Sequence, residues 1–385
     1  SVNNLVTVWQ LVVKQSISHW RLTSAVLLGV LLASAIMSST VIYYDALRDL
    51  ALEQSLDEYE NEDLDIYIHG KGASVSYSEY QRLSNLVGGA MDLQIDWMVS
   101  ASVSAARTPI GSFLGSLSNI PATKLGAIAI EGALKKINLK PELVEEVLMG
   151  NVVQAGNGQA PARQAAIGAG IPDTVPCTTI NKVCASGMKS VMQAAQSIML
   201  GDANIIVAGG MENMSLSPYY LMDARDGMRL GHKKTLDAII QDGLWDPYGD
   251  MHMGNCAEVL AKEEKFSREE QDAFAVESYR RSIEAIEKGY FSDEITTVEI
   301  PQRKGDPIIV ALDEEPGRGK PDKIAKLRTA FEKDGTITAA NASSINDGAA
   351  ALVVMSAERA AELNSNPICK IVAQTSVAHE PLYFT

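Results

Sequence analysis

One segment, residues 175–201, constrains the fold more than any other stretch of this chain. It opens with a short run, residues 175–180, that has the β-branched bias of a strand. Apolar side chains then recur at helical spacing from Val191 to Met199, and Gly201 closes the pattern as a C-cap residue would. The segment therefore predicts a strand that turns directly into a helix.

Cys184 lies in the predicted turn between that strand and that helix, among small residues. Backbone N–H groups at a helix start carry partial positive charge and favour a thiolate over a thiol. A thiolate with room for a substrate beside it is a good covalent nucleophile. The alternatives are a buried structural cysteine and a redox sensor. The position of Cys184 favours the nucleophile.

Strand-like and helix-like segments alternate on both sides of this turn. Residues 122–136 and 162–169 have helical character, whereas residues 148–153 and 204–208 have the character of strands. The glycine-containing loop 151–164 has neither the G-x-G-x-x-G nor the Walker spacing, so it is not a phosphate cradle of those kinds. Strands that alternate with helices are typical of an α/β layered fold.

Composition excludes several classes of protein. The 385 residues suffice for two or more domains, and 46% hydrophobic with 21% charged residues is typical of a folded protein. A net charge of −15 argues against nucleic acid as a partner. The cysteines show no C-x-x-C pair and no zinc spacing, which indicates reduced thiols, no disulfide framework and no metal site.

Residues 22–44 contain no charged residue and are rich in Leu, Val, Ala and Ile. A helix of this length crosses a hydrocarbon core of about 30 Å at about 1.5 Å per residue. A signal peptide has a shorter apolar region, usually of about 7–15 residues. The segment therefore predicts a transmembrane helix and membrane association, after an N-terminal segment of residues 1–21. Lys14 and Arg21 precede the span and Arg48 follows it, which weakly places the N-terminus in the cytoplasm.

Residues 45–98 form a predicted extramembrane segment. Its first part, residues 45–65, is acidic and predicts a helix that leaves the membrane. Alternation over residues 64–68 then predicts a strand, and residues 70–72 predict a turn. This pattern resembles the start of the permease subunits of ABC exporters, in which one helix precedes an extracytoplasmic domain.

After residue 98 the sequence changes character, and a series of motifs follows. They are Ser-Ala-Ala-Arg-Thr-Pro-Ile-Gly (104–111), Gly-Asn-Val-Val-Gln-Ala-Gly (150–156), Asn-Lys-Val-Cys-Ala-Ser-Gly (181–187), Gly-Gly-Met-Glu-Asn-Met-Ser (209–215), Met-His-Met-Gly (251–254) and Asn-Ala-Ser-Ser-Ile-Asn-Asp-Gly-Ala-Ala (341–350). Together they resemble the thiolases, most closely the biosynthetic, acetoacetyl-CoA type, over residues 99–385. The resemblance implies a layered αβα N-terminal domain at residues 99–366, with an inserted loop domain at residues 217–300.

The resemblance also implies an activity. Cys184 would be acetylated, and two acetyl-CoA would interconvert with acetoacetyl-CoA plus CoA through that acetyl-cysteine. The physical chemistry agrees, because a thiolate attacks a thioester readily and N–H groups at the helix start could stabilise the oxyanion. The family implies no permanently bound cofactor, coenzyme A thioesters as substrates, a homo-oligomer (dimer or tetramer) and a cytoplasmic location for this part.

Further positions match the residues that line the coenzyme A tunnel of thiolases. They are Leu244, His252, Met253, Arg318, Ala342 and Ser343. The resemblance puts Leu244 and Arg318 against the adenine end, and Ser343 and His252 along the pantetheine. Met253 would border the acyl pocket. The alternatives are core packing for Leu244 and Met253, and a structural hydrogen-bond donor for His252.

One departure from the family is plain in the sequence. Thiolases complete their site with Asn-Glu-Ala-Phe, with Gly-His-Pro-x-Gly, whose His activates the nucleophile, and with a second Cys in Cys-x-Gly. None of these occurs in the 385 residues, and residues 367–385 match only the opening of that C-terminal half. We therefore expect a truncated thiolase of impaired activity, joined accidentally to unrelated membrane-protein sequence. The alternative is a permease fragment that carries an inert thiolase tail.

Overall fold

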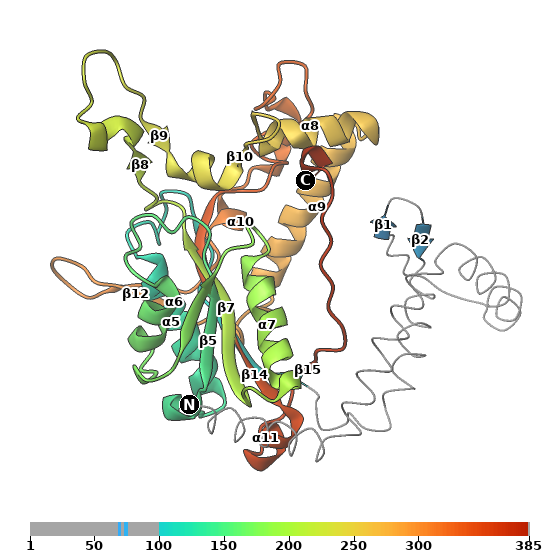
Figure 1. Cartoon of the computed structure of the whole chain (residues 1–385). Coiled ribbons are helices and arrows are strands. Elements are labelled where there is room, and N and C mark those ends of the chain that lie inside the picture. The colour runs from blue at the N-terminus through green and yellow to red at the C-terminus, as the bar shows by residue number, and fades with distance from the viewer. Residues whose placement is uncertain (1–67, 71–72, 76–99, 384–385) are drawn as a thin grey trace, which may run out of the picture. The chain divides into compact units, whose positions relative to one another are not determined.

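Our computed structural model describes residues 68–70, 73–75 and 100–383 (Figure 1). The chain divides into two compact units, Ser1–Gly89 and Ala90–Thr385. In the first unit, strands β1 (Ile68–Gly70) and β2 (Ala73–Val75) form an antiparallel pair. The pair begins where the predicted strand at residues 64–68 ends. Of the predicted turn at residues 70–72, Gly70 is the last residue of β1, and residues 71–72 lie outside the described residues.

The predicted transmembrane helix, residues 22–44, lies outside the described residues, as does the N-terminal segment 1–21. Most of the predicted permease-like segment, residues 45–98, also lies outside them. Within the part of the chain that the structure describes, every helix is too short or too polar to span a bilayer. The membrane span and the permease resemblance therefore stay predictions.

A mixed seven-stranded sheet lies at the centre of the second unit (Figure 1). Its strands are β3 (Ser100–Arg107), β4 (Gly111–Ser112), β5 (Glu146–Gly150), β6 (Cys177–Ile180), β7 (Ile205–Asn213), β14 (Asn346–Ser356) and β15 (Cys369–Lys370). Their order is β15-β3-β14-β7-β5-β6, and β4 pairs with β14. Strand β5 runs parallel to β6 and β7, whereas β14 runs antiparallel to β7 and β3.

Helices cover both faces of this sheet. Helices α5 (Ala122–Lys136) and α6 (Pro161–Gly168) pack on one face, and α7 (Ser186–Leu200) packs on the other. Side chains alternate between the two faces along a strand. Ile205 of β7 therefore packs in the hydrophobic cluster between the sheet and α5, whereas Ile206 packs in the cluster between the sheet and α7. The predicted α/β layered fold is thus confirmed for this unit.

The largest differences between the predicted and the observed strands are at the C-terminal ends of β5 and β7. The strand predicted at residues 148–153 ends at Gly150, because a side-chain carboxylate, that of Glu212, takes the backbone N–H groups of Val152 and Val153. The strand predicted at 204–208 continues to Asn213, because β14 pairs with it over its whole length.

A long excursion separates β7 from β14, which are neighbours in the sheet. It holds β8 (Tyr219–Tyr220), η3 (Met222–Asp226), β9 (Leu236–Asp237), η4 (Ile240–Leu244), β10 (Trp245–Asp246), β11 (Met251–His252), α8 (Met253–Glu263), α9 (Arg268–Glu287), β12 (Val298–Ile300), β13 (Ile308–Val310), α10 (Glu315–Arg318) and η5 (Pro321–Lys326). The remaining elements are η2 (Pro141–Leu143), α11 (Ala357–Glu362) and η6 (Pro381–Tyr383). The predicted loop domain, residues 217–300, lies within this excursion, and its bounds stay a prediction.

Candidate active site

Cys184 lies in the turn between β6 and α7, as the sequence predicts. Strand β6 ends at Ile180, α7 begins at Ser186, and the Cys184 side chain is exposed. The N-cap residue of α7 is Ala185, whose methyl side chain cannot accept a hydrogen bond. No N-cap side chain therefore competes with a bound ligand for the N–H groups of the first turn.

The backbone of this turn is held in an unusual conformation. Val183, directly before Cys184, has φ +48°, which is rare for a β-branched residue. Its N–H donates to Oδ1 of Asn181 at 2.9 Å. The hydroxyl of Ser186 donates to the carbonyl of Val183 at 2.5 Å and accepts from the N–H of Lys182 at 2.8 Å. Side chains on both sides thus fix the position of Cys184.

Glycines let the start of α7 lie directly on the sheet. A Cβ atom on Gly150 at the end of β5 would come within 2.6 Å of the backbone nitrogen of Gly187. A Cβ atom on Gly210 of β7 would come within 3.2 Å of the Gly187 Cα atom. A Cβ atom at position 150 would clash with the backbone of α7 and one at position 210 would crowd it, so glycines at both positions let the sheet and the first turn of α7 form one packed unit.

Glu212 lies near this packed unit, and no role for it was predicted from the sequence. Its carboxylate accepts hydrogen bonds from the N–H groups of Val152 (2.8 Å) and Val153 (3.4 Å), and from Nδ2 of Asn151 (2.9 Å). Burial raises the pKa of the Glu212 carboxyl, while these hydrogen bonds act to lower it. The only sequence signal was its place in the Gly209–Ser215 motif.

A short hairpin brings three predicted coenzyme A residues together. Strands β10 and β11 pair antiparallel with Trp245 opposite His252, so Leu244, just before Trp245, and Met253, just after His252, lie at the same end of the hairpin. All three predicted residues are half-buried. Figure 1 shows that this hairpin belongs to the excursion that extends from the sheet end at which α7 begins.

His252 is both the N-cap of α8 and a ring-stacking partner. Its Nδ1 accepts the N–H of Gly254 at 3.0 Å, and its ring stacks on Phe331 with centroids 4.9 Å apart. Burial lowers the pKa of His252 below its usual 6.5. The structural hydrogen bond considered from the sequence therefore exists, but His252 is its acceptor. This leaves Nε2 to carry the proton of the neutral ring.

The loop that carries Ala342 and Ser343 is tied to α8 and α9. The fully buried carboxylate of Glu258 on α8 accepts the N–H groups of Thr336 and Ile337, each at 2.9 Å. Five residues further along, Asn341 joins a second network. These bonds fix the chain just before Ala342, which is half-buried, and Ser343, which is exposed.

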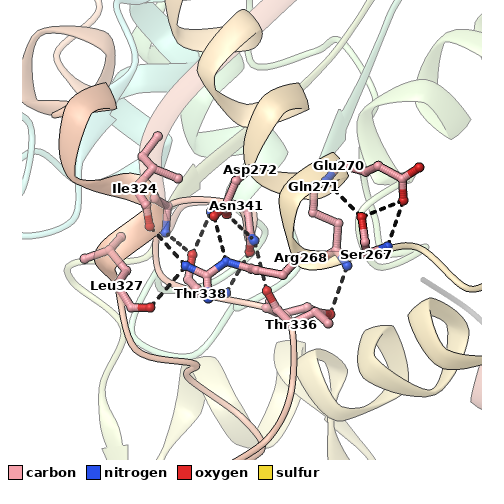
Figure 2. A network of polar contacts seen from close by, with 12 residues as sticks. Ser267, Arg268, Glu270, Gln271, Asp272, Ile324, Leu327, Thr336, Thr338 and Asn341 are labelled. Carbon is pink, nitrogen blue, oxygen red and sulfur yellow. Dashed lines mark hydrogen bonds and ion pairs between the residues drawn. The ribbon is translucent and has the colours of Figure 1, made fainter.

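Figure 2 shows this second network around Asp272 of α9. One Asp272 oxygen accepts from Nδ2 of Asn341 at 2.9 Å, and the other accepts from Nε of Arg268 at 2.7 Å. Arg268 also donates to the carbonyls of Ile324 and Leu327. The start of α9 therefore fixes two separate segments, residues 324–327 and the loop at Asn341, relative to each other.

Arg318 does not join the other predicted residues. It ends the short helix α10, its side chain is 54% exposed, and it forms an ion pair with Glu314 at 3.5 Å. Within the described residues, no hydrogen bond or ion pair connects Arg318 to the hairpin or to the loop. In the same part of the chain, no group of His, Cys, Asp and Glu side chains could hold a metal ion.

Comparison with known proteins places this geometry in context. Residues 100–358 match the family model described as "Thiolase, N-terminal domain". The chain is 55% identical over 286 residues to acetyl-CoA acetyltransferase 2 of Arabidopsis thaliana, covering 74% of this chain and 71% of that protein. It is 56% identical over 283 residues to the mitochondrial acetyl-CoA acetyltransferase of Danio rerio, covering 73% and 67%. It is 54% identical over 280 residues to the acetyl-CoA acetyltransferase of Cupriavidus necator, covering 72% and 71%.

Proposed function

This chain belongs to the thiolase family, and on that premise we propose that it transfers acetyl groups between coenzyme A thioesters through a covalent intermediate on Cys184. The observation that carries the proposal is the exposed Cys184 side chain in the turn before α7, where the N-cap Ala185 offers no competing acceptor. A thiolate there has access to a substrate and lies next to the positive end of a helix.

The acylation step follows from this placement. Sγ of Cys184 attacks the carbonyl carbon of acetyl-CoA, and the carbonyl oxygen becomes an oxyanion in the tetrahedral intermediate. The carbon–sulfur bond to coenzyme A then breaks, and coenzyme A leaves as a thiolate. One thioester replaces another, so the step needs no cofactor. N–H groups of the first turn of α7 are the candidate donors to the oxyanion.

We propose that the hairpin and the Ala342–Ser343 loop bind the coenzyme A part of the substrate. His252 would donate from Nε2 to an acceptor of the pantetheine, since its Nδ1 is occupied by Gly254. Leu244 and Met253 offer half-buried apolar surface at the end of the hairpin next to His252. Arg318 would meet the adenine end, which requires its exposed side chain to leave Glu314.

The second half-reaction makes or breaks a carbon–carbon bond and needs a base for the substrate carbon. The 385 residues contain no Gly-His-Pro-x-Gly segment and no Cys-x-Gly run. We therefore propose that the chain of these 385 residues accepts an acetyl group on Cys184 but turns over slowly. Homo-oligomerisation and a cytoplasmic location of residues 99–385 belong to the same proposal.

The test compares acetoacetyl-CoA cleavage by the 385-residue chain with cleavage by the same chain extended by the C-terminal half of a related acetyl-CoA acetyltransferase. Cys184→Ser in both proteins is the matched control. We expect turnover only in the extended protein, and only with Cys184 present. Turnover that survives Cys184→Ser would overturn the proposed nucleophile. Normal turnover by the 385 residues alone would overturn the proposal of slow turnover, because another residue, such as His252, would then supply the base.

A further inference from the structure

A continuous series of hydrogen bonds runs from the carboxylate of Glu212 to the backbone beside Cys184. Glu212 lies at the end of β7 and accepts the N–H of Val152 at 2.8 Å. The carbonyl of the same residue, Val152, accepts from Nδ2 of Asn181 at 3.4 Å. Oδ1 of Asn181 then accepts the N–H of Val183 at 2.9 Å. The series ends at the residue that precedes Cys184.

A second link joins the same two segments. The backbone N–H of Asn151 donates to the carbonyl of Ile180 at 3.0 Å, and Ile180 directly precedes Asn181. Nδ2 of Asn151 also donates to Glu212 at 2.9 Å. The loop that Glu212 holds is therefore attached to the turn through its backbone as well as through the side chain of Asn181.

The chemistry of Glu212 suits this arrangement. All three of its partners are N–H donors, one of them the Asn151 side-chain amide, and a carboxylate is the side chain that offers acceptors only. A glutamine would place an NH₂ group against one of these donors. Hydrogen bonds to an ionised acceptor are also stronger than those to a neutral one.

Asn181 acts on the strained part of the turn. Val183 has φ +48°, a conformation that a β-branched residue leaves unless its surroundings hold it there. A bond from the N–H of residue i+2 to the side chain of residue i is the contact by which Asn stabilises such turns. If Val183 relaxes, Cys184 changes direction, because it is the next residue along the chain.

We propose that Glu212 and Asn181 are positioning residues, which hold the turn so that Sγ of Cys184 meets the carbonyl carbon of a bound acetyl-CoA. This inference rests on the proposed function. Misplacing a reacting atom by about 1 Å can lower a rate about 100-fold. Removing either side chain should therefore lower the rate of Cys184 acetylation about 10- to 100-fold, with little change in the acetyl-CoA concentration that gives half the maximal rate.

The test uses the 385-residue chain and the variants Asn181→Ala, Asn181→Ser, Glu212→Ala and Glu212→Gln. Asn204→Ala is the matched control, because Asn204 is also exposed but precedes β7 at the opposite end of that strand from Glu212. Acetylation of Cys184 by acetyl-CoA and alkylation of Cys184 by iodoacetamide are both followed by peptide mass spectrometry. Circular dichroism at the assay temperature selects variants that are folded.

We expect Asn181→Ala and Glu212→Ala to slow acetylation at saturating acetyl-CoA. Asn181→Ser keeps an oxygen near the Val183 N–H and Glu212→Gln keeps one acceptor, so both should recover part of the rate. Folded variants that acetylate like Asn204→Ala would overturn the positioning role. If the unmodified chain is not acetylated at all, the proposed function fails instead, and alkylation then decides: equal rates in all variants would overturn the positioning role, and slower rates in the two alanine variants would support it.

Discussion

The backbone nitrogen of Gly187 lies only 2.6 Å from the place that a Cβ atom on Gly150 would occupy. Gly150 ends strand β5, and Gly187 is the second residue of helix α7. Real Cβ atoms do not approach a backbone nitrogen so closely. The contact therefore sets how near α7 lies to the sheet, and with it the place of the turn that carries Cys184.

We expect Gly150→Ala to push the start of α7 away from β5. The overpacking should lower the free energy of unfolding by about 1–3 kcal/mol and should slow acetylation of Cys184. Gly317→Ala is the control, since a Cβ atom there meets nothing within 4 Å. Denaturant unfolding and peptide mass spectrometry measure the two effects. A Gly150→Ala protein as stable and as reactive as the control would show that the contact is unimportant.

The sequence predicts regular elements well where local signals and packing agree. The helix predicted at residues 122–136 is α5 with the same bounds, and the strand–turn–helix around Cys184 is present. In both places most of the apolar side chains at helical spacing face the sheet, although Met199 near the end of α7 is exposed. The local preference and the tertiary structure therefore indicate the same element.

Long-range polar contacts could not be predicted from the sequence. Val152 and Val153 have high strand propensity, yet Glu212, about sixty residues away, takes their N–H groups. Asp272 likewise binds Asn341 across 69 residues. Such bonds depend on which loops the fold brings together, so no local pattern indicates them. Resemblance to a family located His252, whereas its role as an N-cap required the coordinates.

Asp272→Ala should loosen the loop that carries Ala342 and Ser343. It leaves Arg268 and Asn341 without a shared acceptor, and an unsatisfied buried partner costs about 1–3 kcal/mol of stability. We expect faster hydrogen exchange at residues 336–343 and a higher acetyl-CoA concentration for half the maximal rate of acetylation. Hydrogen-exchange mass spectrometry and acetylation kinetics measure the two effects. Glu277→Ala on the same helix is the control, because Glu277 pairs only with Arg280 and Arg281 among the described residues. Equal exchange in both variants would contradict the expectation.

The contribution of the His252 N-cap to the free energy of unfolding should depend on pH. Burial lowers the pKa of folded His252 below 6.5, so the unfolded chain binds the proton more readily. This contribution to stability is present above pH 6.5 and is lost as the pH falls through the folded pKa, because protonated Nδ1 cannot accept from Gly254. His252→Asn keeps a cap that does not titrate. Unfolding free energies of both proteins at about pH 7.5 and about pH 5.5 test this. A difference between them that does not change with pH would refute it.

The predicted span at residues 22–44 gives a separate expectation. The 385-residue chain should stay in the membrane fraction after carbonate washing, because the segment has no charge over the length of a bilayer core. The double variant Val30→Lys, Leu31→Lys adds an insertion cost of about 5–7 kcal/mol at the centre and should be released. Recovery of the unmodified chain in the soluble fraction would mean that the segment does not span.

Acetylation of Cys184 tests the central claim most directly. The 385-residue chain is incubated with acetyl-CoA, digested and mapped by mass spectrometry. The account predicts one acetyl group on the peptide that contains Cys184, removed by hydroxylamine as a thioester is. It predicts no acetyl group on Cys177, Cys256 or Cys369, and none on the Cys184→Ser chain. An unmodified Cys184 in folded protein, or equal acetylation of the exposed Cys369, would contradict the assignment of Cys184 as the nucleophile.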